Sequence, residues 1–532
     1  MASRILGLVR EQVFAFLFGA GKFSDAFIVA FRIPNLLRDL FAEGALTTGF
    51  IPVFSGYLVN ESQQKAYRFA NFVLSLILLV LGAIVVSGIL GSDWVVRLIA
   101  PGFERESLHL QSLQLVFGPL PADLGGTWNK FSLTSLLVKI VMPYILFVSL
   151  ASVVMGMLNS QHVYLVPALS PAVFNTVAVV TGTALYLVKP DITMTVIVWT
   201  WGALLGGLGQ LVFQMPSLFR LKFRFRFALS LRDAGVRKLL KLIAPAVFGL
   251  AATQINIFIN TILASQLEAG SVSWLNYAFR LIMLPIGVFG VAIATVSAVQ
   301  SARSAAGRDM PKVRRDLASM LKLNFFLSIA STAGFLVLGG LIVNVIYQHG
   351  HFKAFDTNQT CAALSLFAIG LFAYSSVKII VPVFYALSDP RIPVLSSFCA
   401  VVGNLAVSLS TYKIWGFKGL ALGTTTAAVI NFLFLYMAFT RKYGGVKGHG
   451  VGLSFLKVLF SSAAMALILW LVMKLDFITR LLSGSLGIRL LVMLGLVLLG
   501  IVVFFGTAVL VRSEEAKKFT SRLGFRLGSQ HR

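Results

Sequence analysis

The chain has 532 residues, of which 58% are hydrophobic and 12% are charged, whereas soluble domains carry about 25% charged residues. This composition excludes an ordinary soluble globular protein and predicts an all-α polytopic membrane protein. The formal net charge of +26 comes from Lys and Arg that lie mostly in short loops between apolar runs. That placement sets membrane topology and attracts anionic lipids, so we expect anionic lipid partners and no nucleic acid.

Apolar runs of about 20 residues predict about 14 transmembrane helices. In chain order they occupy residues 3–20, 24–58, 68–92, 132–158, 163–187, 193–216, 238–266, 272–301, 316–347, 360–387, 392–412, 418–440, 452–474 and 487–511. Arg10 interrupts the first run, which predicts a retained span and not a cleaved signal peptide. Cys361 and Cys399 lie in apolar runs and predict no disulfide framework.

The loops predict an orientation. If the N-terminus is cytoplasmic, 25 of the 45 cationic residues lie in cytoplasmic loops and tails and 10 lie on the opposite side. The positive-inside rule therefore predicts that both termini are cytoplasmic and that the number of spans is even.

A run of alternating aromatic and basic residues, 219–227, marks the midpoint of the chain. It fits a linker that lies on anionic headgroups, or a positive-inside anchor in a loop, and we favour the anchor.

The two halves on either side of this run are related in sequence. Ala30-Phe31-Arg32 recurs as Ala278-Phe279-Arg280, and Leu158-Asn159-Ser160 resembles Leu387-Ser388-Asp389. These matches predict two pseudo-symmetric lobes of six helices around a central cavity, with two further helices at the C-terminal end. We expect a first lobe over 1–218, a basic cytoplasmic linker over 219–237, a second lobe over 238–440, and spans 13 and 14 with a basic cytoplasmic tail over 441–532.

Five arginines, Arg4, Arg10, Arg32, Arg38 and Arg280, lie inside predicted spans. A guanidinium near the bilayer centre costs about 2.5–3.5 kcal/mol on insertion scales, so it predicts a water-filled cavity or an anionic ligand. Asp25, Asp39 and Glu43 offset part of this charge, and internal ion pairs are the alternative role for Asp25 and Glu43. The remaining positive surplus indicates an anionic, phosphate-bearing substrate.

The spacing of these residues predicts a polar face. Asp25 and Arg32 are two helical turns apart, and Arg32, Asn35, Asp39 and Glu43 follow at spacings of three and four. We expect this stripe to point away from lipid.

Catalytic and metal sites are not predicted. His349 and His351 have no partners nearby in sequence that would complete a metal site, and the chain contains no Walker-type loop, HExxH motif or nucleophile elbow. We expect no cofactor, with turnover coupled to the membrane potential or to a monovalent ion. A membrane-embedded glycosyltransferase and a structural scaffold are the competing classes.

The PNLLR sequence at 34–38 followed by FAEGA at 41–45 resembles the MurJ/MviN family of lipid II flippases. Supporting matches are SRILG at 3–7, SDAF at 24–27, APGF at 100–103, GSVSW at 270–274 and GVFGVA at 287–292. The family belongs to the multidrug/oligosaccharidyl-lipid/polysaccharide exporter superfamily, so the resemblance implies two six-helix lobes that open alternately to either side.

The resemblance also implies a function and residues for it. It predicts that the chain is a transporter and not an enzyme, and that it moves an undecaprenyl-diphosphate-linked headgroup from the cytoplasmic to the periplasmic leaflet of the bacterial inner membrane. The resemblance implies that Arg10, Arg38 and Arg280 bind the substrate. It places Arg4, Asp25 and Glu43 at further functionally important positions, and Arg32 at a position that is basic in relatives. We expect a monomer. An exporter of another lipid-linked oligosaccharide or of drugs is the alternative within the superfamily.

Three features depart from the family pattern. Asp39 stands where relatives commonly have a basic residue, and the 104–130 loop is longer than usual. The stretch after Ala294 also lacks the proline that the family pattern predicts near Val299-Gln300.

Overall fold

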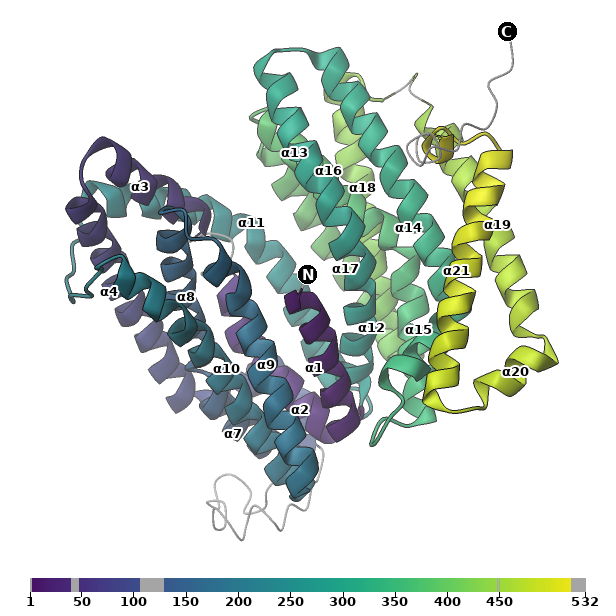
Figure 1. The fold of residues 1–532 in the computed structure, drawn as a ribbon, viewed down its shortest axis with the longest axis horizontal. Coiled ribbons are helices and arrows are strands. Elements are labelled where there is room, and N and C mark those ends of the chain that lie inside the picture. Colours follow the sequence, from purple (N-terminus) through teal and green to yellow (C-terminus); the bar gives the residue numbers. More distant parts are fainter. Residues whose placement is uncertain (1, 40–46, 106–128, 447, 449, 518–532) are drawn as a thin grey trace. The chain divides into compact units, whose positions relative to one another are not determined.

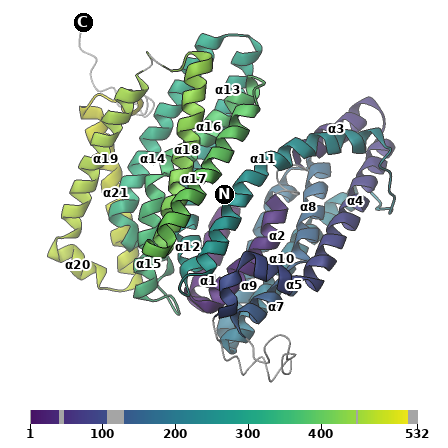
Figure 2. The same cartoon turned by 180° about the vertical axis from the view of Figure 1, so that it is seen from behind.

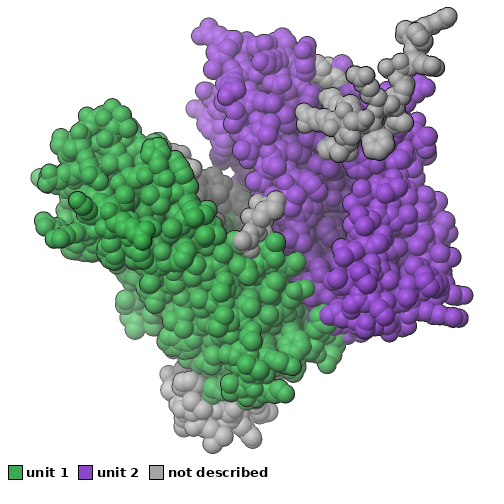
Figure 3. Space-filling model, viewed as in Figure 1, with its two compact units in different colours: residues 1–273, 349–353 green, residues 274–348, 354–532 purple. Residues whose placement is uncertain are grey.

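The structure is a computed structural model that describes residues 2–39, 47–105, 129–446, 448 and 450–517 (Figure 1). The described residues fold almost wholly into helices and include no β-strand. They form two compact units, residues 1–273 with 349–353 and residues 274–348 with 354–532 (Figure 3). The predicted all-α fold class is confirmed for these residues.

Unit 1 contains the N-terminal helices. They are α1 (Ala2–Phe18), α2 (Lys22–Arg38), α3 (Thr47–Asn60), α4 (Gln63–Leu90), α5 (Ser92–Ile99), the short helix η2 (Pro101–Arg105), α7 (Lys130–Val141), α8 (Tyr144–Asn159), α9 (Leu165–Val188), α10 (Ile192–Arg220) and α11 (Ala234–Ser265). The next helix, α12 (Ser271–Pro285), begins in unit 1 and continues into unit 2 after Ser273.

Unit 2 contains the remaining helices, in which α17 and α18 form a long hairpin (Figure 2). They are the π-helical turn η4 (Ile286–Gly290), α13 (Val291–Ala306), α14 (Met310–Tyr347), α15 (Ala354–Ile369), α16 (Leu371–Ala386), α17 (Arg391–Trp415), α18 (Phe417–Tyr443), α19 (Val451–Met473), α20 (Asp476–Leu482) and α21 (Leu486–Leu510).

Ten helical segments of the described chain are long and apolar enough to cross a membrane, or up to eleven if the pair α15 and α16, bent by 44°, counts as one span. These eleven segments match eleven of the predicted spans. The other three predicted spans fall on α1, on α2 with α3, and on α11, whose described residues are not among the ten segments. The count of fourteen stays a prediction.

Two predicted spans contain breaks. The span predicted over 132–158 is divided between α7 and α8 at Pro143, since proline cannot donate the backbone hydrogen bond that a continuous helix needs. The span predicted over 272–301 contains the π-helical turn η4 directly after Pro285. Proline is the common cause of such interruptions.

The contact boundary after Ser273 differs from the predicted linker at 219–237. The start of α11 belongs to unit 1 because it packs on α3: a Cβ added to Gly235 would lie 2.6 Å from a ring carbon of Tyr57. The predicted lobes rest on a sequence repeat, and they stay a prediction.

Each unit has its own apolar core. In unit 1 the part relevant to function is a cluster from α7, α8, α9 and α10 that includes Tyr144 and Phe174, with Phe27 and Phe31 of α2 packed against it. In unit 2 the core includes Phe326, Phe384 and Phe504. Large apolar side chains are also exposed, such as Phe460 and Leu491, as expected of helices that face lipid.

Candidate anion-binding site

The polar face predicted for α2 is present in the structure, and within unit 1 it contacts α11 and the start of α12. The Asp25 carboxylate accepts a hydrogen bond from Ser273 N at 2.9 Å. Seven residues further along α2, Arg32 Nη1 donates to Thr261 Oγ1 at 2.5 Å. At the end of the helix, Asp39 Oδ2 accepts from Gln254 Nε2 at 3.3 Å. The seven-residue spacing therefore places three ionisable side chains against protein and not against lipid.

Arg10 and Arg38 lie at the same aromatic cluster. The Arg10 guanidinium carbon lies 5.2 Å from the ring centroid of Phe174, and Arg38 Nη1 lies 3.4 Å from the hydroxyl oxygen of Tyr144. The rings of Tyr144 and Phe174 are 5.6 Å apart. The structure thus brings together two of the three arginines predicted to bind the substrate, one from α1 and one from α2.

Each of these arginines pairs with the acid next to it in sequence. Arg10 Nη2 lies 2.5 Å from Glu11 Oε1, and Arg38 Nη2 lies 2.9 Å from Asp39 Oδ1. The Arg10 and Arg38 side chains keep 17% and 23% of their surface exposed. The Arg38–Asp39 pair is partly exposed and weak, so the Arg38 guanidinium can exchange its carboxylate partner for a ligand. Glu11 is buried, so the Arg10–Glu11 pair costs more to exchange.

Glu11 was missing from the charge balance predicted from the sequence. With Glu11 included, the five arginines of the first, second and eighth predicted spans face four acids, and the positive surplus is smaller than expected. The sequence contains Arg10 and Glu11 side by side, but adjacent residues on a helix do not face each other. Their adjacency is therefore only a weak signal of the pair.

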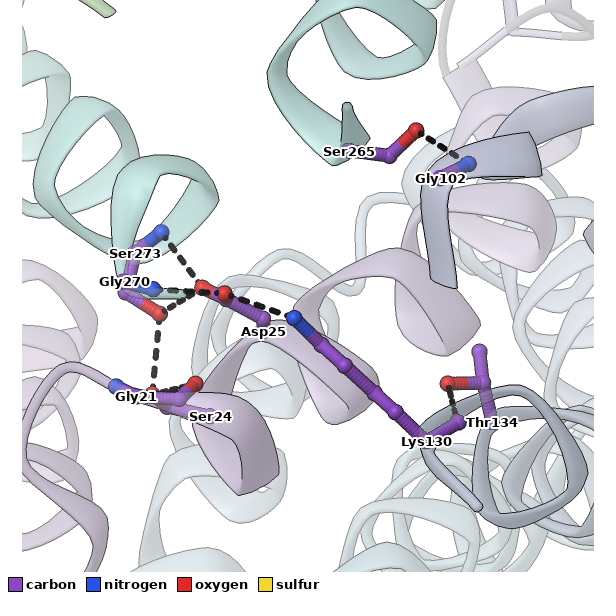
Figure 4. A network of polar contacts seen from close by, with 9 residues as sticks. All are labelled: Gly21, Ser24, Asp25, Gly102, Lys130, Thr134, Ser265, Gly270 and Ser273. Carbon is purple, nitrogen blue, oxygen red and sulfur yellow. Dashed lines mark hydrogen bonds and ion pairs between the residues drawn. The ribbon is translucent and has the colours of Figure 1, made fainter. Parts of the chain in front are cut away.

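Asp25 has a different environment, shown in Figure 4. Its carboxylate is buried and accepts hydrogen bonds from Gly270 N at 2.8 Å, Ser273 N at 2.9 Å and Ser273 Oγ at 2.6 Å. The two backbone donors lie at the first turn of α12, where unpaired N–H groups and the helix dipole favour an anion. Asp25 therefore caps α12, and its predicted substrate contact stays a prediction.

Lys130 completes this network. Lys130 Nζ lies 3.2 Å from Asp25 Oδ2 (Figure 4). The same ammonium lies 3.9 Å from the ring centroid of Phe103. The sequence predicts that Lys130 ends the 104–130 loop, whereas the structure buries it at the start of α7. The ion pair that was the alternative role of Asp25 is therefore present.

Arg280 lies on α12 in unit 2, and its side chain is exposed. The neighbouring Phe279 packs against Phe367, with ring centroids 5.4 Å apart, and against Tyr374. Arg4 lies in α1 but its side chain is outside the described part of the structure, and Glu43 lies outside the described residues.

The arrangement in unit 1 suits recognition of a phosphate-bearing anion. Guanidinium groups present several N–H donors in a planar fork that matches phosphate oxygens, and the aromatic faces beside them exclude water from one side. Among the residues that the structure describes, no group of three or more His, Cys, Asp or Glu side chains is placed to hold a metal ion.

Comparisons with known proteins agree with the resemblance found in the sequence. The profile of the family described as "Lipid II flippase MurJ" matches residues 14–492. The "Probable lipid II flippase MurJ" of Buchnera aphidicola subsp. Schizaphis graminum is 33% identical over 444 residues, which cover 83% of this chain and 81% of the relative. The protein of the same name from Vibrio cholerae is 31% identical over 534 residues, with 98% and 96% covered.

A solved structure supports the same assignment. The chain resembles "Lipid II flippase MurJ, inward closed conformation" with a TM-score of 0.76 at 25% sequence identity, over 98% of this chain and 97% of that chain. The family profile covers most of the chain, and relatives that are 30% identical or more cover nearly all of it. The chain is a polytopic membrane protein, and it belongs to the MurJ family of lipid II flippases.

Proposed function

We propose that this protein is a lipid II flippase that moves the undecaprenyl-diphosphate-linked peptidoglycan precursor from the cytoplasmic to the periplasmic leaflet of the bacterial inner membrane. It acts as a transporter and not as an enzyme. The family membership supports this function, and the observation within the structure that supports it best is the pair Arg10 and Arg38 at one aromatic cluster. The names of the relatives do not favour the alternative, an exporter of drugs or of another glycan.

The substrate has a headgroup too polar to cross lipid and a chain too apolar to leave it. In our proposal Arg10 and Arg38 bind the diphosphate, and Arg280 contributes a third guanidinium, with Arg4, Arg32 and Glu43 at supporting positions. Aromatic faces beside Arg10 and Arg38 lower the local dielectric, which strengthens charge-assisted hydrogen bonds to the anion.

Transport proceeds by alternating access, in which two six-helix lobes open a central cavity to one side of the membrane and then to the other. The protein acts as a monomer with fourteen spans and with both termini in the cytoplasm. The exchange of the Arg10–Glu11 and Arg38–Asp39 pairs for the diphosphate is the step at which the substrate is recognised. No cofactor takes part. Outward movement of an anion is favoured by an inside-negative potential, by about 2.3 kcal/mol per charge per 100 mV, so the potential or a monovalent ion drives turnover.

Complementation of a flippase-depleted strain tests the proposal. Arg10→Ala, Arg38→Ala and Arg280→Ala are each expected to abolish growth at normal membrane levels of the protein. Arg97→Ala is the matched control, because Arg97 is an exposed arginine that also pairs with an acid, Glu104, at 2.7 Å. Full growth of all three test variants, or loss of growth with the control alone, would contradict the proposal.

A further inference from the structure

The segment after α10 is held in one conformation by three side chains of α4. Tyr67 OH donates to Leu221 O at 2.7 Å, and Ala228 N donates to Ser75 Oγ at 3.0 Å. Between them, Asn71 Oδ1 accepts from Arg226 N at 3.1 Å. Tyr67, Asn71 and Ser75 are one helical turn apart, so they form a row along α4.

The same segment has an inner and an outer side. Phe223 is buried, and its ring lies edge-on to that of Tyr67, with centroids 5.3 Å apart. Phe225 and Phe227 are exposed by 47% and 62%. The cations of the segment are exposed as well; they are Arg220, Lys222, Arg224 and Arg226. The backbone bonds to α4 therefore turn one aromatic ring inward and present cations and two phenylalanines outward.

An open hollow lies at the start of this segment. Its volume is about 510 Å³, and it is lined by Gln63, Gln64, Tyr67, Arg220, Leu221 and Lys222. Two of the lining residues are cations and three others offer amide or hydroxyl groups, so the hollow suits a phosphate group.

The charge around the hollow is strongly positive. Eight Lys and Arg residues lie between 219 and 241, against one acid, Asp233. Asp233 caps α11, accepting from Gly235 N at 2.9 Å and Val236 N at 3.1 Å. The nearby acid Glu61 pairs with Lys65 at 2.7 Å. Asp233 and Glu61 are thus engaged by other groups.

We propose that this hollow and the outer side of residues 219–227 form a binding site for the headgroup of an anionic phospholipid, such as phosphatidylglycerol. Arg220 and Lys222 bind the phosphate, while Phe225 and Phe227 enter the interfacial layer beside it, where aromatic side chains are favoured. Exposed phenylalanines between cations fit a lipid surface better than a nucleic acid. The site uses none of the predicted substrate arginines and goes beyond the proposed function.

This inference changes the role predicted from the sequence, where a positive-inside anchor was favoured. An anchor needs only charge in a loop, whereas here α4 holds the backbone on both sides of Lys222, Arg224 and Arg226. Asn71 is a positioning residue in this account, because it orders Arg224 and Arg226 without facing the hollow.

Native mass spectrometry of the full-length protein in detergent tests the site. The protein is titrated with phosphatidylglycerol or phosphatidylcholine, and the Kd is measured for each lipid. We expect tighter binding of phosphatidylglycerol, and a loss of about 30-fold in R220Q/K222Q, since each basic residue near an anionic surface contributes about 1 kcal/mol. R303Q/K312Q is the matched control, because it removes two exposed cations from another loop predicted to be cytoplasmic.

Further variants keep the test decisive. Asn71→Ala is expected to weaken phosphatidylglycerol binding severalfold with every charge retained, and R224Q/R226Q replaces the first variant if that one fails to fold. Equal losses in R220Q/K222Q and R303Q/K312Q would overturn the proposal, as would equal affinity for the two lipids. Tighter binding of a short RNA than of phosphatidylglycerol would also overturn it. Complementation is measured separately, so failure of this site leaves the flippase proposal intact.

Discussion

Two charged regions of unit 1 differ in how deeply their side chains are buried and in where their partners lie in the sequence. The Asp25 and Lys130 side chains are exposed by only 1% and 2%, and Asp25 accepts hydrogen bonds from four donor groups. The Arg10 and Arg38 side chains are exposed by 17% and 23%, and each has a carboxylate partner that is adjacent in sequence. Both regions contain ionisable groups in helices of a membrane protein.

The difference indicates which charges maintain the fold and which are available to a ligand. A buried pair that is fully hydrogen-bonded is costly to break, because the remaining charge has neither water nor a partner. A partly exposed pair such as Arg38–Asp39 contributes about 0–1 kcal/mol, so exchanging its partner for a ligand costs little. We therefore assign Asp25 and Lys130 chiefly to structure, and Arg10 and Arg38 to substrate.

Asp25→Ala is expected to have the largest effect on stability. It removes the buried acceptor that the Lys130 ammonium shares with the N–H groups of Gly270 and Ser273 at the start of α12. Breaking a buried pair costs about 3–5 kcal/mol. The measurement is thermal unfolding in detergent, compared with Glu104→Ala, which removes an acid from an exposed pair with Arg97.

A double variant sharpens this prediction. Asp25→Asn with Lys130→Met removes both charges and keeps an acceptor for the α12 amides, so we expect it to be more stable than Lys130→Met alone. If Asp25→Ala unfolds at the same temperature as Glu104→Ala, Asp25 does not stabilise the fold, and the contrast between the two regions is lost.

Gly207→Ala is expected to have an intermediate effect. A Cβ at this position would lie 2.5 Å from a ring carbon of Tyr144, so the ring beside Arg38 must move. Overpacking of this kind costs about 1–3 kcal/mol. We expect reduced stability together with reduced complementation, measured against Gly82→Ala, where an added Cβ has no heavy atom within 4 Å. Equal behaviour of the two variants would show that Tyr144 does not position Arg38.

Arg38→Ala is expected to reduce stability by less than about 1 kcal/mol, because the pair with Asp39 is partly exposed. Transport, in contrast, is expected to be lost, and Arg38→Lys to recover only part of it, since an ammonium lacks the planar fork of donors. Thermal unfolding and complementation are measured on the same variants. A loss of stability as large as that of Asp25→Ala would place Arg38 with the structural charges.

The smallest expected effect is a pH dependence in unit 2. Lys442 Nζ lies 2.5 Å from Asp389 Oδ2, and the hydrogen bond from Lys442 lowers the pKa of Asp389 below its ordinary value of 3.8. A lowered carboxyl pKa gives stability that is complete above the ordinary value and is lost as the pH falls through the lowered one. The difference in melting temperature between wild type and Lys442→Gln should therefore be constant at neutral pH and shrink below about pH 4. A difference that grows on acidification would contradict this assignment.

Much of the fold follows from the sequence alone. The helix α9 spans Leu165–Val188, against a prediction of 163–187, and α18 spans Phe417–Tyr443, against 418–440. Such agreement arises because about 20 apolar residues in a row have no stable alternative in a bilayer. The polar face of α2 was equally predictable, because helical spacing alone places Asp25, Arg32 and Asp39 together.

Partners distant in sequence were not predictable. Lys130 lies 105 residues from Asp25, and nothing in its local sequence distinguishes it from a loop lysine. The contact of Arg10 with Phe174 depends in the same way on how α1 packs against α9, which hydropathy does not encode. The break at Pro143, in contrast, had a local signal, the proline inside a predicted span.

The most direct test of the central claim is a sidedness assay for lipid II in vesicles that contain the purified protein. Lipid II placed in one leaflet is followed by its accessibility to an added reagent, with wild type, Arg10→Ala/Arg38→Ala and Arg97→Ala compared at equal protein levels. We predict rapid movement with wild type and Arg97→Ala, and none above protein-free vesicles with the double variant. Movement at the wild-type rate by a folded Arg10→Ala/Arg38→Ala variant would contradict the account.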